Sequence, residues 1–291
     1  MKTITFLLFF SFSISTLLAQ DFYLNSNGVT CMCPDAAVGD TGVVNGITYT
    51  KRTIEQITIT NAVTTCTSGI TDMSLFIYGN PDISTWDVSD VTTMSYMFNE
   101  NYEFNQDISN WDVSSVTIMD HMFYYAGTFN QDISSWDVSN VTNMESMFGY
   151  AFVFNQPLGN WDVSNVTNMN NLFGGTPFNQ DISSWDVSNV TNMGSMFGGT
   201  PFNQDISSWD VSNVTNMSYM FTGTPFNQPI GNWDVSSVTN MSRMFESTTF
   251  NQPIGNWDLS SVTDMYWMFQ STPFNQPIGD WDVSNVTNMD R

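Results

Sequence analysis

The stretch FNQDISSWDVSNVTNMESMF, residues 129–148, recurs along most of the chain with few changes. A Trp-Asp pair marks each copy, at intervals of 25 residues three times and then 24 residues five times, and its tryptophans are Trp86, Trp111, Trp136, Trp161, Trp185, Trp209, Trp233, Trp257 and Trp281. The residue missing from the later copies lies in the following loop, which has five residues at 124–128 and four at 174–177. A length change confined to one connection predicts a stack of near-identical coils.

The apolar residues of one unit predict two short elements. Residues 129–133 alternate apolar and polar side chains, which is typical of a strand. Val141, Met144 and Phe148 follow at spacings of three and four, which is typical of one face of a two-turn helix, with Ser139 or Asn140 as its N-cap. The Trp and Val of each Trp-Asp-Val are expected to face the core. The sequence thus predicts an α/β solenoid of about nine strand-plus-short-helix coils of 24–25 residues.

The unit FNQDISSWDVSNVTNMxxMF resembles the repeat of BspA-like leucine-rich-repeat surface proteins, over about residues 69–291. Residues 28–59 resemble the lead-in that precedes such arrays. The resemblance implies a leucine-rich-repeat-like solenoid on the bacterial exterior, with roles in adhesion and in contacts with hosts or other cells. Leucine is rare in these repeats, and Met, Trp and Phe take its place, so the curvature of ordinary leucine-rich repeats does not transfer.

The N-terminus, MKTITFLLFFSFSISTLLAQ, has the features of a secretory signal peptide: Lys2, an apolar run and Ala19 as a cleavage residue. We expect three parts, a signal peptide (1–19), a cysteine-containing lead-in (20–68) and the repeats (69–291), which end in the middle of a unit. The mature chain has no apolar run long enough to span a membrane. We therefore expect a secreted protein, held at the cell surface.

The three cysteines, Cys31, Cys33 and Cys66, all precede the repeats. Export favours disulfide formation, and an odd number of cysteines leaves one thiol over. We expect Cys66 to pair with either Cys31 or Cys33.

The composition restricts the classes of partner. The formal net charge is −23, and no Lys or Arg lies between Arg52 and Arg243. Such a chain repels phosphate backbones and anionic lipid surfaces, which disfavours nucleic acid and direct membrane insertion. Hydrophobic residues make up 41% of the chain and aromatic residues 15%, enough to form a large core. The acidity therefore does not indicate disorder.

An aspartate follows each repeated tryptophan, so stacked coils place carboxylates about 5 Å apart, where they repel by about 1 kcal/mol per neighbour. The interpretation that we favour is that each carboxylate accepts a backbone N–H of its own Asp-Val-Ser turn. A second is a Ca²⁺ bridge between coils, with Asp112, Asp137, Asp162 and Asp186 as ligands. A third is the carboxylate pair of a retaining glycosidase. Because no unit departs from the pattern, we assign no catalytic residue and expect no enzyme, and no cofactor unless Ca²⁺ binds.

Aromatic residues gather where the units differ, at the pair inside VTxMxxMF and in the loop that follows. Exposed rings are favoured at interfaces. Loops that vary in sequence between units can, however, also acquire rings that only pack on neighbouring coils. We expect an edge that binds a protein or a cell-surface glycan. The candidate residues are Tyr96, Tyr102, Tyr124, Tyr125, Tyr150, Phe152, Tyr219, Tyr266 and Trp267. The alternative function is a passive structural spacer of the cell exterior, stiffened by Ca²⁺ if the ion binds.

Overall fold

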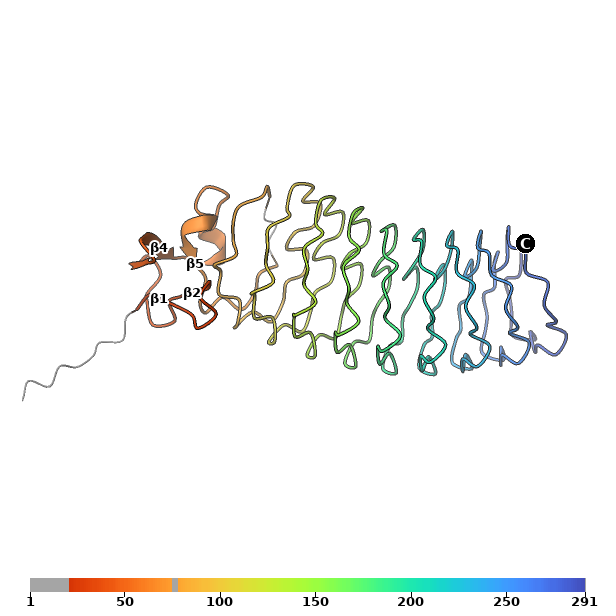
Figure 1. Cartoon of the computed structure of the whole chain (residues 1–291). Helices are drawn as coiled ribbons and strands as arrows, with labels where there is room; N and C mark the ends of the chain where they lie inside the picture. Colours follow the sequence, from red (N-terminus) through yellow and green to blue (C-terminus); the bar gives the residue numbers. More distant parts are fainter. Residues whose placement is uncertain (1–20, 75–77, 291) are drawn as a thin grey trace, which may run out of the picture.

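The computed structural model describes residues 21–74 and 78–290. A small N-terminal part with short strands is followed by a row of coils that lie side by side up to the C-terminus (Figure 1). The predicted signal peptide, residues 1–19, lies outside the described residues.

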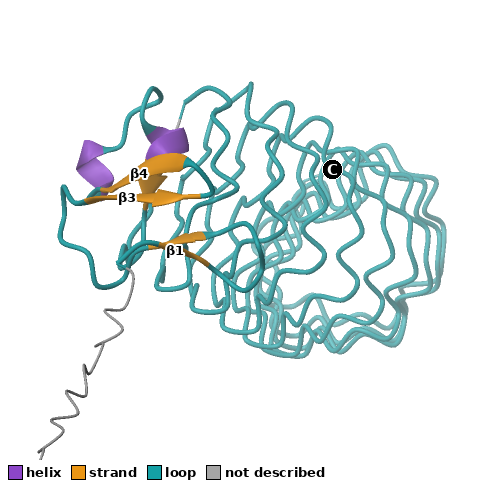
Figure 2. Cartoon of the chain, turned by 60° about the vertical axis from the view of Figure 1, so that its left-hand side comes forward, coloured by secondary structure: helices purple, strands orange, loops and turns teal. Residues whose placement is uncertain are grey.

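The N-terminal part contains all the named strands and helices of the described residues (Figure 2). They are β1 (Tyr23–Leu24), β2 (Cys31–Met32), β3 (Thr41–Val44), β4 (Ile47–Lys51), the 3-10 helices η1 (Ile54–Gln56) and η2 (Ala62–Thr64), and β5 (Thr65–Cys66). β1 and β2 pair antiparallel, and β4 pairs antiparallel with β3 and in parallel with β5. The β3–β4 hairpin turns at Asn45 and Gly46, whose φ angles of 52° and 81° suit a tight two-residue loop.

This part covers the first coil and is cross-linked by a disulfide between Cys33 and Cys66. Cys31 remains a buried thiol, and its backbone N–H donates to the carbonyl oxygen of Thr85 in the first coil, at 2.8 Å. Burial, together with the nearby Asp87 carboxylate, raises the pKa of the Cys31 thiol to about 12. Asp87 is itself 3% exposed and accepts a hydrogen bond from the Ser68 hydroxyl, which in turn accepts the backbone N–H of Cys33. The carboxylate therefore ties the disulfide region to the stack.

Parallel hydrogen bonds between equivalent positions join each coil to the next. One chain of isolated parallel bridges runs along the stack through Asp72, Thr93, Ile118, Asn143, Asn168, Asn192, Asn216, Asn240, Asp264 and Asn288. Beside it, the backbone N–H groups of Met144, Ser146 and Phe148 donate to carbonyl oxygens of the following coil at 3.0, 2.8 and 3.0 Å. Each coil thus satisfies the backbone of its neighbour, as stacked repeats require.

The expected α/β solenoid of strand-plus-helix coils, like that of leucine-rich repeats, is wrong. The described residues contain no α-helix, and no strand after β5. Residues 141–148 cannot form a helix because Ser146 has a φ of 54° and the alternate N–H groups bond to the next coil. The amide of Asn140, an expected helix cap, instead donates to the carbonyl oxygen of Ser114 in the preceding coil at 2.8 Å.

The expected strand at 129–133 is also absent. Phe129 and Ile133 are buried, but Gln131 is only half-buried and its amide donates to the carbonyl oxygen of Asn105, one coil earlier, at 3.0 Å. The side-chain oxygen of Asn105 accepts the backbone N–H of Asn130 at the same distance. Side-chain amides thus link the coils here, where the prediction had a strand with Gln131 facing inward.

The core runs continuously through the stack, and the prediction that the Trp and Val of each Trp-Asp-Val face inward is confirmed for the inner coils. Trp185 is 3% exposed, and its indole N–H donates to the carbonyl oxygen of Leu158 in the preceding coil at 3.0 Å. Phe173 stacks on two rings of the following repeat, on Phe178 at 3.8 Å between ring centroids and on Phe197 at 6.1 Å. Stacked rings contribute beyond the area that they bury.

Candidate functional site

Most of the predicted binding residues lie at two positions of the repeat where the backbone has a positive φ angle in successive coils. Tyr96 and His121 have φ angles of 60° and 56°, and Tyr125 and Tyr150 have 56° and 57°. Non-glycine residues adopt such angles only when their surroundings enforce them. A hydrogen bond to the next coil holds this backbone angle at His121, whose backbone N–H donates to the backbone carbonyl oxygen of Glu145 at 2.8 Å. The backbone therefore sets the direction in which each ring leaves the stack.

The rings of the first coils form one contiguous group, which we call the aromatic ribbon: Tyr96, His121, Tyr124, Tyr125, Tyr150 and Phe152. Tyr96 stacks on His121 at 4.5 Å between ring centroids, and the imidazole meets Tyr124 edge-on at 5.2 Å. Tyr125 stacks on Tyr150 at 4.7 Å and meets Phe152 edge-on at 5.9 Å. The structure thus brings five of the predicted binding residues together and adds the histidine.

Glycines of the following coil make room for these tyrosines. A Cβ atom added to Gly149 would lie 2.9 Å from the ring of Tyr124, and one added to Gly175 would lie 2.6 Å from the ring of Tyr150. Tyr102 lies over Gly127 in the same way, at 3.3 Å. Each tyrosine precedes its glycine by one repeat, a signal that is present in the sequence but that only the stacking register makes meaningful.

The ribbon retains exposed surface. Phe152 is 53% exposed and Tyr96 40%, while Tyr124, Tyr125 and Tyr150 are half-buried against each other. The rings therefore pack on their neighbours and still leave part of their surface exposed to solvent.

Carboxylate side chains lie beside the ribbon. Asp120 lies 3.3 Å from Nδ1 of His121, and Glu145 accepts a hydrogen bond from the Asn168 amide at 3.0 Å. Desolvation, and then the charges of Asp120 and Glu145, raise the pKa of the Tyr96 phenol. Desolvation also raises the pKa of Tyr124. Both phenols are therefore neutral hydrogen-bond donors at physiological pH.

Three more predicted binding residues, Tyr219, Tyr266 and Trp267, form a second group farther along the stack, which we call the arginine cluster, while Tyr102 belongs to neither group. The Arg243 guanidinium lies 5.3 Å from the ring centroids of Tyr219 and Tyr266 and 4.3 Å from that of Trp267. Glu246 lies 3.3 Å from its terminal nitrogen. Arg243 lies at one of the positions where the repeated units differ, and it is the only Lys or Arg of the sequence between Arg52 and Arg291.

The aspartates after the repeated tryptophans have the local role that we favoured. Oδ1 of Asp112 accepts the backbone N–H of Ser114 at 3.1 Å, and Asp186 does the same with Ser188 at 3.0 Å. The other members of the column make the equivalent bond. Hydrogen bonds from the side chain and backbone of Ser188 lower the pKa of Asp186. Within residues 21–74 and 78–290, no group of three or more His, Cys, Asp or Glu side chains is placed to hold a metal ion.

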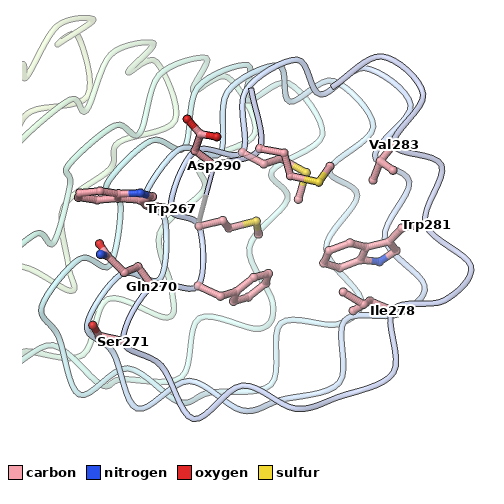
Figure 3. A pocket seen from close by; sticks show the side chains of 11 residues that line it. Trp267, Gln270, Ser271, Ile278, Trp281, Val283 and Asp290 are labelled. Carbon is pink, nitrogen blue, oxygen red and sulfur yellow. The ribbon is translucent and has the colours of Figure 1, made fainter. Parts of the chain in front are cut away.

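An apolar hollow of about 590 Å³ lies at the last coils (Figure 3). Trp267 and Phe269 line it from one coil, and Ile278, Trp281 and Val283 from the next. In the inner coils, the core is formed by the residues equivalent to Phe269, Ile278, Trp281 and Val283. The hollow is thus continuous with the core and separate from the aromatic ribbon.

Of the described residues, none belongs to a helix long and apolar enough to cross a membrane.

The comparisons with known proteins give one family. Searches of curated proteins and of solved structures gave no match. A family model described as "Mycoplasma protein of unknown function, DUF285" matches residues 60–177, 153–249 and 201–291. Overlapping matches to one model are typical of tandem repeats. Since these matches cover well over half of the chain, it belongs to this family of repeat proteins of unknown function.

Proposed function

We propose that this chain is an exported repeat protein that mediates adhesion or macromolecular binding through the aromatic ribbon. The observation that carries the proposal is a contiguous set of six rings on successive coils, of which Phe152 is 53% and Tyr96 40% exposed. Exposed aromatic groups of this kind mark interaction surfaces, and tyrosine is enriched among the residues that dominate binding energy. The intervening coils then act as a rigid support.

The sequence supports the same proposal. The repeats resemble those of BspA-like surface proteins, which implies adhesion at the cell exterior, and residues 1–19 have the features of a signal peptide. This resemblance concerns the repeat sequence, since the leucine-rich-repeat architecture expected from it is wrong. The partner is a protein or a cell-surface glycan. A net charge of −23 disfavours nucleic acid and direct membrane insertion.

Binding is a better proposal than catalysis. In the Asp column each carboxylate is engaged by its own turn, as Asp186 is with Ser188. A hydrolase would need one pair in an environment unlike the others, with the two pKa values moved apart. The Asp137, Asp186 and Asp234 pKa values are all lowered by the same serine hydrogen bonds. We therefore propose that the protein is not an enzyme.

The test replaces Tyr102, Tyr124, Tyr125 and Tyr150 with Ser together and measures adherence of the purified protein to cells and to matrix proteins. The control replaces the exposed threonines Thr191, Thr215, Thr239 and Thr263 with Ser, which keeps their hydroxyls in place. We expect the tyrosine variant to lose adherence while its melting temperature stays close to that of the control. A folded tyrosine variant that adheres as well as the parent would favour the alternative, a passive spacer.

A further inference from the structure

The arginine cluster shows how this edge of the stack holds a guanidinium group. Tyr219, Arg243 and Trp267 occupy one column in three successive coils, so the arginine stands between two rings. Tyr266 adds a third ring, and Glu246 supplies the carboxylate. The Nε of Arg243 is buried and has no hydrogen-bond partner among the described residues. Ring faces therefore surround the guanidinium on that side, as in cation–π contacts.

The aromatic ribbon has the same backbone frame. Tyr219 and Arg243 have φ angles of 58° and 56°, and their N–H groups donate to the next coil at 2.8 Å each. Tyr96 and His121, earlier in the same column, have φ angles of 60° and 56° and make the equivalent bonds at 3.0 and 2.8 Å. The next position in the column is Ser146, which carries no ring. The ribbon thus shares the backbone frame of the arginine cluster, with His121 at the position of Arg243, and with Ser146, which is buried and accepts a hydrogen bond from the Asn171 amide at 3.1 Å, at the position of Trp267.

The ribbon also has carboxylates beside it but no Lys or Arg of its own. Asp120 lies 3.3 Å from Nδ1 of His121, and desolvation followed by the charges of Asp120 and Glu145 raises the pKa of Tyr96. No Lys or Arg occurs in the sequence from residue 53 to residue 242. Negative charge beside aromatic rings is complementary to a cation, and the net charge of −23 attracts basic partners from a distance.

We propose that the aromatic ribbon binds arginine side chains of a basic protein segment, stacking each guanidinium on a ring face with a flanking carboxylate as its counter-charge. This inference rests on the proposed function and names the chemistry of its partner. Arginine is favoured over lysine because its planar guanidinium stacks on rings and pairs with a carboxylate through two parallel hydrogen bonds. The ammonium group of lysine is a compact, strongly hydrated charge.

The experiment uses two fluorescently labelled peptides, each with four Arg or four Lys residues separated by Gly-Ser, and the full-length mature protein in 150 mM NaCl. We expect the arginine peptide to bind at least tenfold more tightly than the lysine peptide. Replacing Tyr124, Tyr125 and Tyr150 with Ser should remove this preference and leave only weak binding that depends on charge. The control replaces Asp205, Asp210 and Asp234 with Asn, removing three charges away from the ribbon, and should keep the preference.

The outcomes separate this inference from the proposed function. Equal affinity for the two peptides, or an arginine preference that survives the tyrosine substitutions, would overturn the inference. If the same tyrosine variant still loses cell adherence, the ribbon is a binding surface for another chemistry, such as a glycan, and the proposed function stands. If adherence is also unchanged, both are wrong.

Discussion

Replacing Trp185 with Phe is expected to lower the free energy of unfolding by about 2–3 kcal/mol, of which about 1 kcal/mol comes from one hydrogen bond. The indole N–H donates to the carbonyl oxygen of Leu158 at 3.0 Å, and that carbonyl also accepts the backbone N–H of Trp161. The carbonyl therefore keeps one partner, and only the net value of the lost bond counts. Trp185 is 3% exposed, so the smaller ring also leaves a cavity that costs about 1–2 kcal/mol.

The measurement is guanidinium-induced unfolding followed by far-UV circular dichroism, with Trp281→Phe as the control. Trp281 makes the equivalent bond, to Ile254 at 3.2 Å, but is only partly buried in the last coil. In a stack in which each coil contacts only its neighbours, it should cost less than half as much. A free energy of unfolding of Trp185→Phe within about 0.5 kcal/mol of the parent value would refute this prediction, because that difference is below the net value of a hydrogen bond.

Three further predictions concern the aspartates and the disulfide. Asp87→Ala should cost about 2–3 kcal/mol in urea-induced unfolding because the carboxylate is buried, whereas exposed Asp186→Ala should cost under about 1 kcal/mol; equal costs would contradict this difference. The Asp186 pKa is lowered in the folded state, so its stabilisation is complete above the ordinary value of 3.8 and is lost as pH falls through the folded-state pKa. The Tm difference between Asp186→Ala and the parent should therefore shrink in acid; a constant difference from pH 7 to pH 2 would argue against the turn bond. Cys66→Ser opens a loop of 33 residues and should cost about 3–4 kcal/mol; in the parent protein, peptide mapping should find Cys31 as the free thiol.

The repeat, its core and its aspartate turns were predictable because each depends on residues within one unit. The period follows from the Trp-Asp pairs, and burial of the Trp and Val side chains follows from their recurrence. The Asp-Val-Ser bond spans two residues, as between Asp186 and Ser188. Such short-range chemistry is visible in one copy of the sequence.

The local backbone was not predictable, because neighbouring coils decide it. Val141, Met144 and Phe148 have helical spacing, and all three are buried, but Met144 and Phe148 donate their N–H groups to the following coil. Gln131 likewise has strand-like spacing but bonds to Asn105 of the preceding coil. Periodicity reports which side chains are buried and not where the backbone hydrogen bonds go.

The candidate site was predictable as a set of rings and not as an arrangement. Ring-to-ring contacts depend on the stacking register, which places Tyr150 over Gly175 and Arg243 between Tyr219 and Trp267. The signal in the sequence is the interval of one repeat between these residues. It acquires meaning only once the coils are known to stack in register.

The central claim, that the aromatic ribbon is a binding surface, is tested most directly by a saturation binding isotherm of the purified protein on adherent cells. Two desolvated aromatic anchors of about 2 kcal/mol each correspond to a loss of about 10³-fold in affinity. The variant with Tyr102, Tyr124, Tyr125 and Tyr150 replaced by Ser should therefore show a Kd at least about 100-fold above that of the parent. An unchanged Kd, with both proteins folded, would contradict the claim.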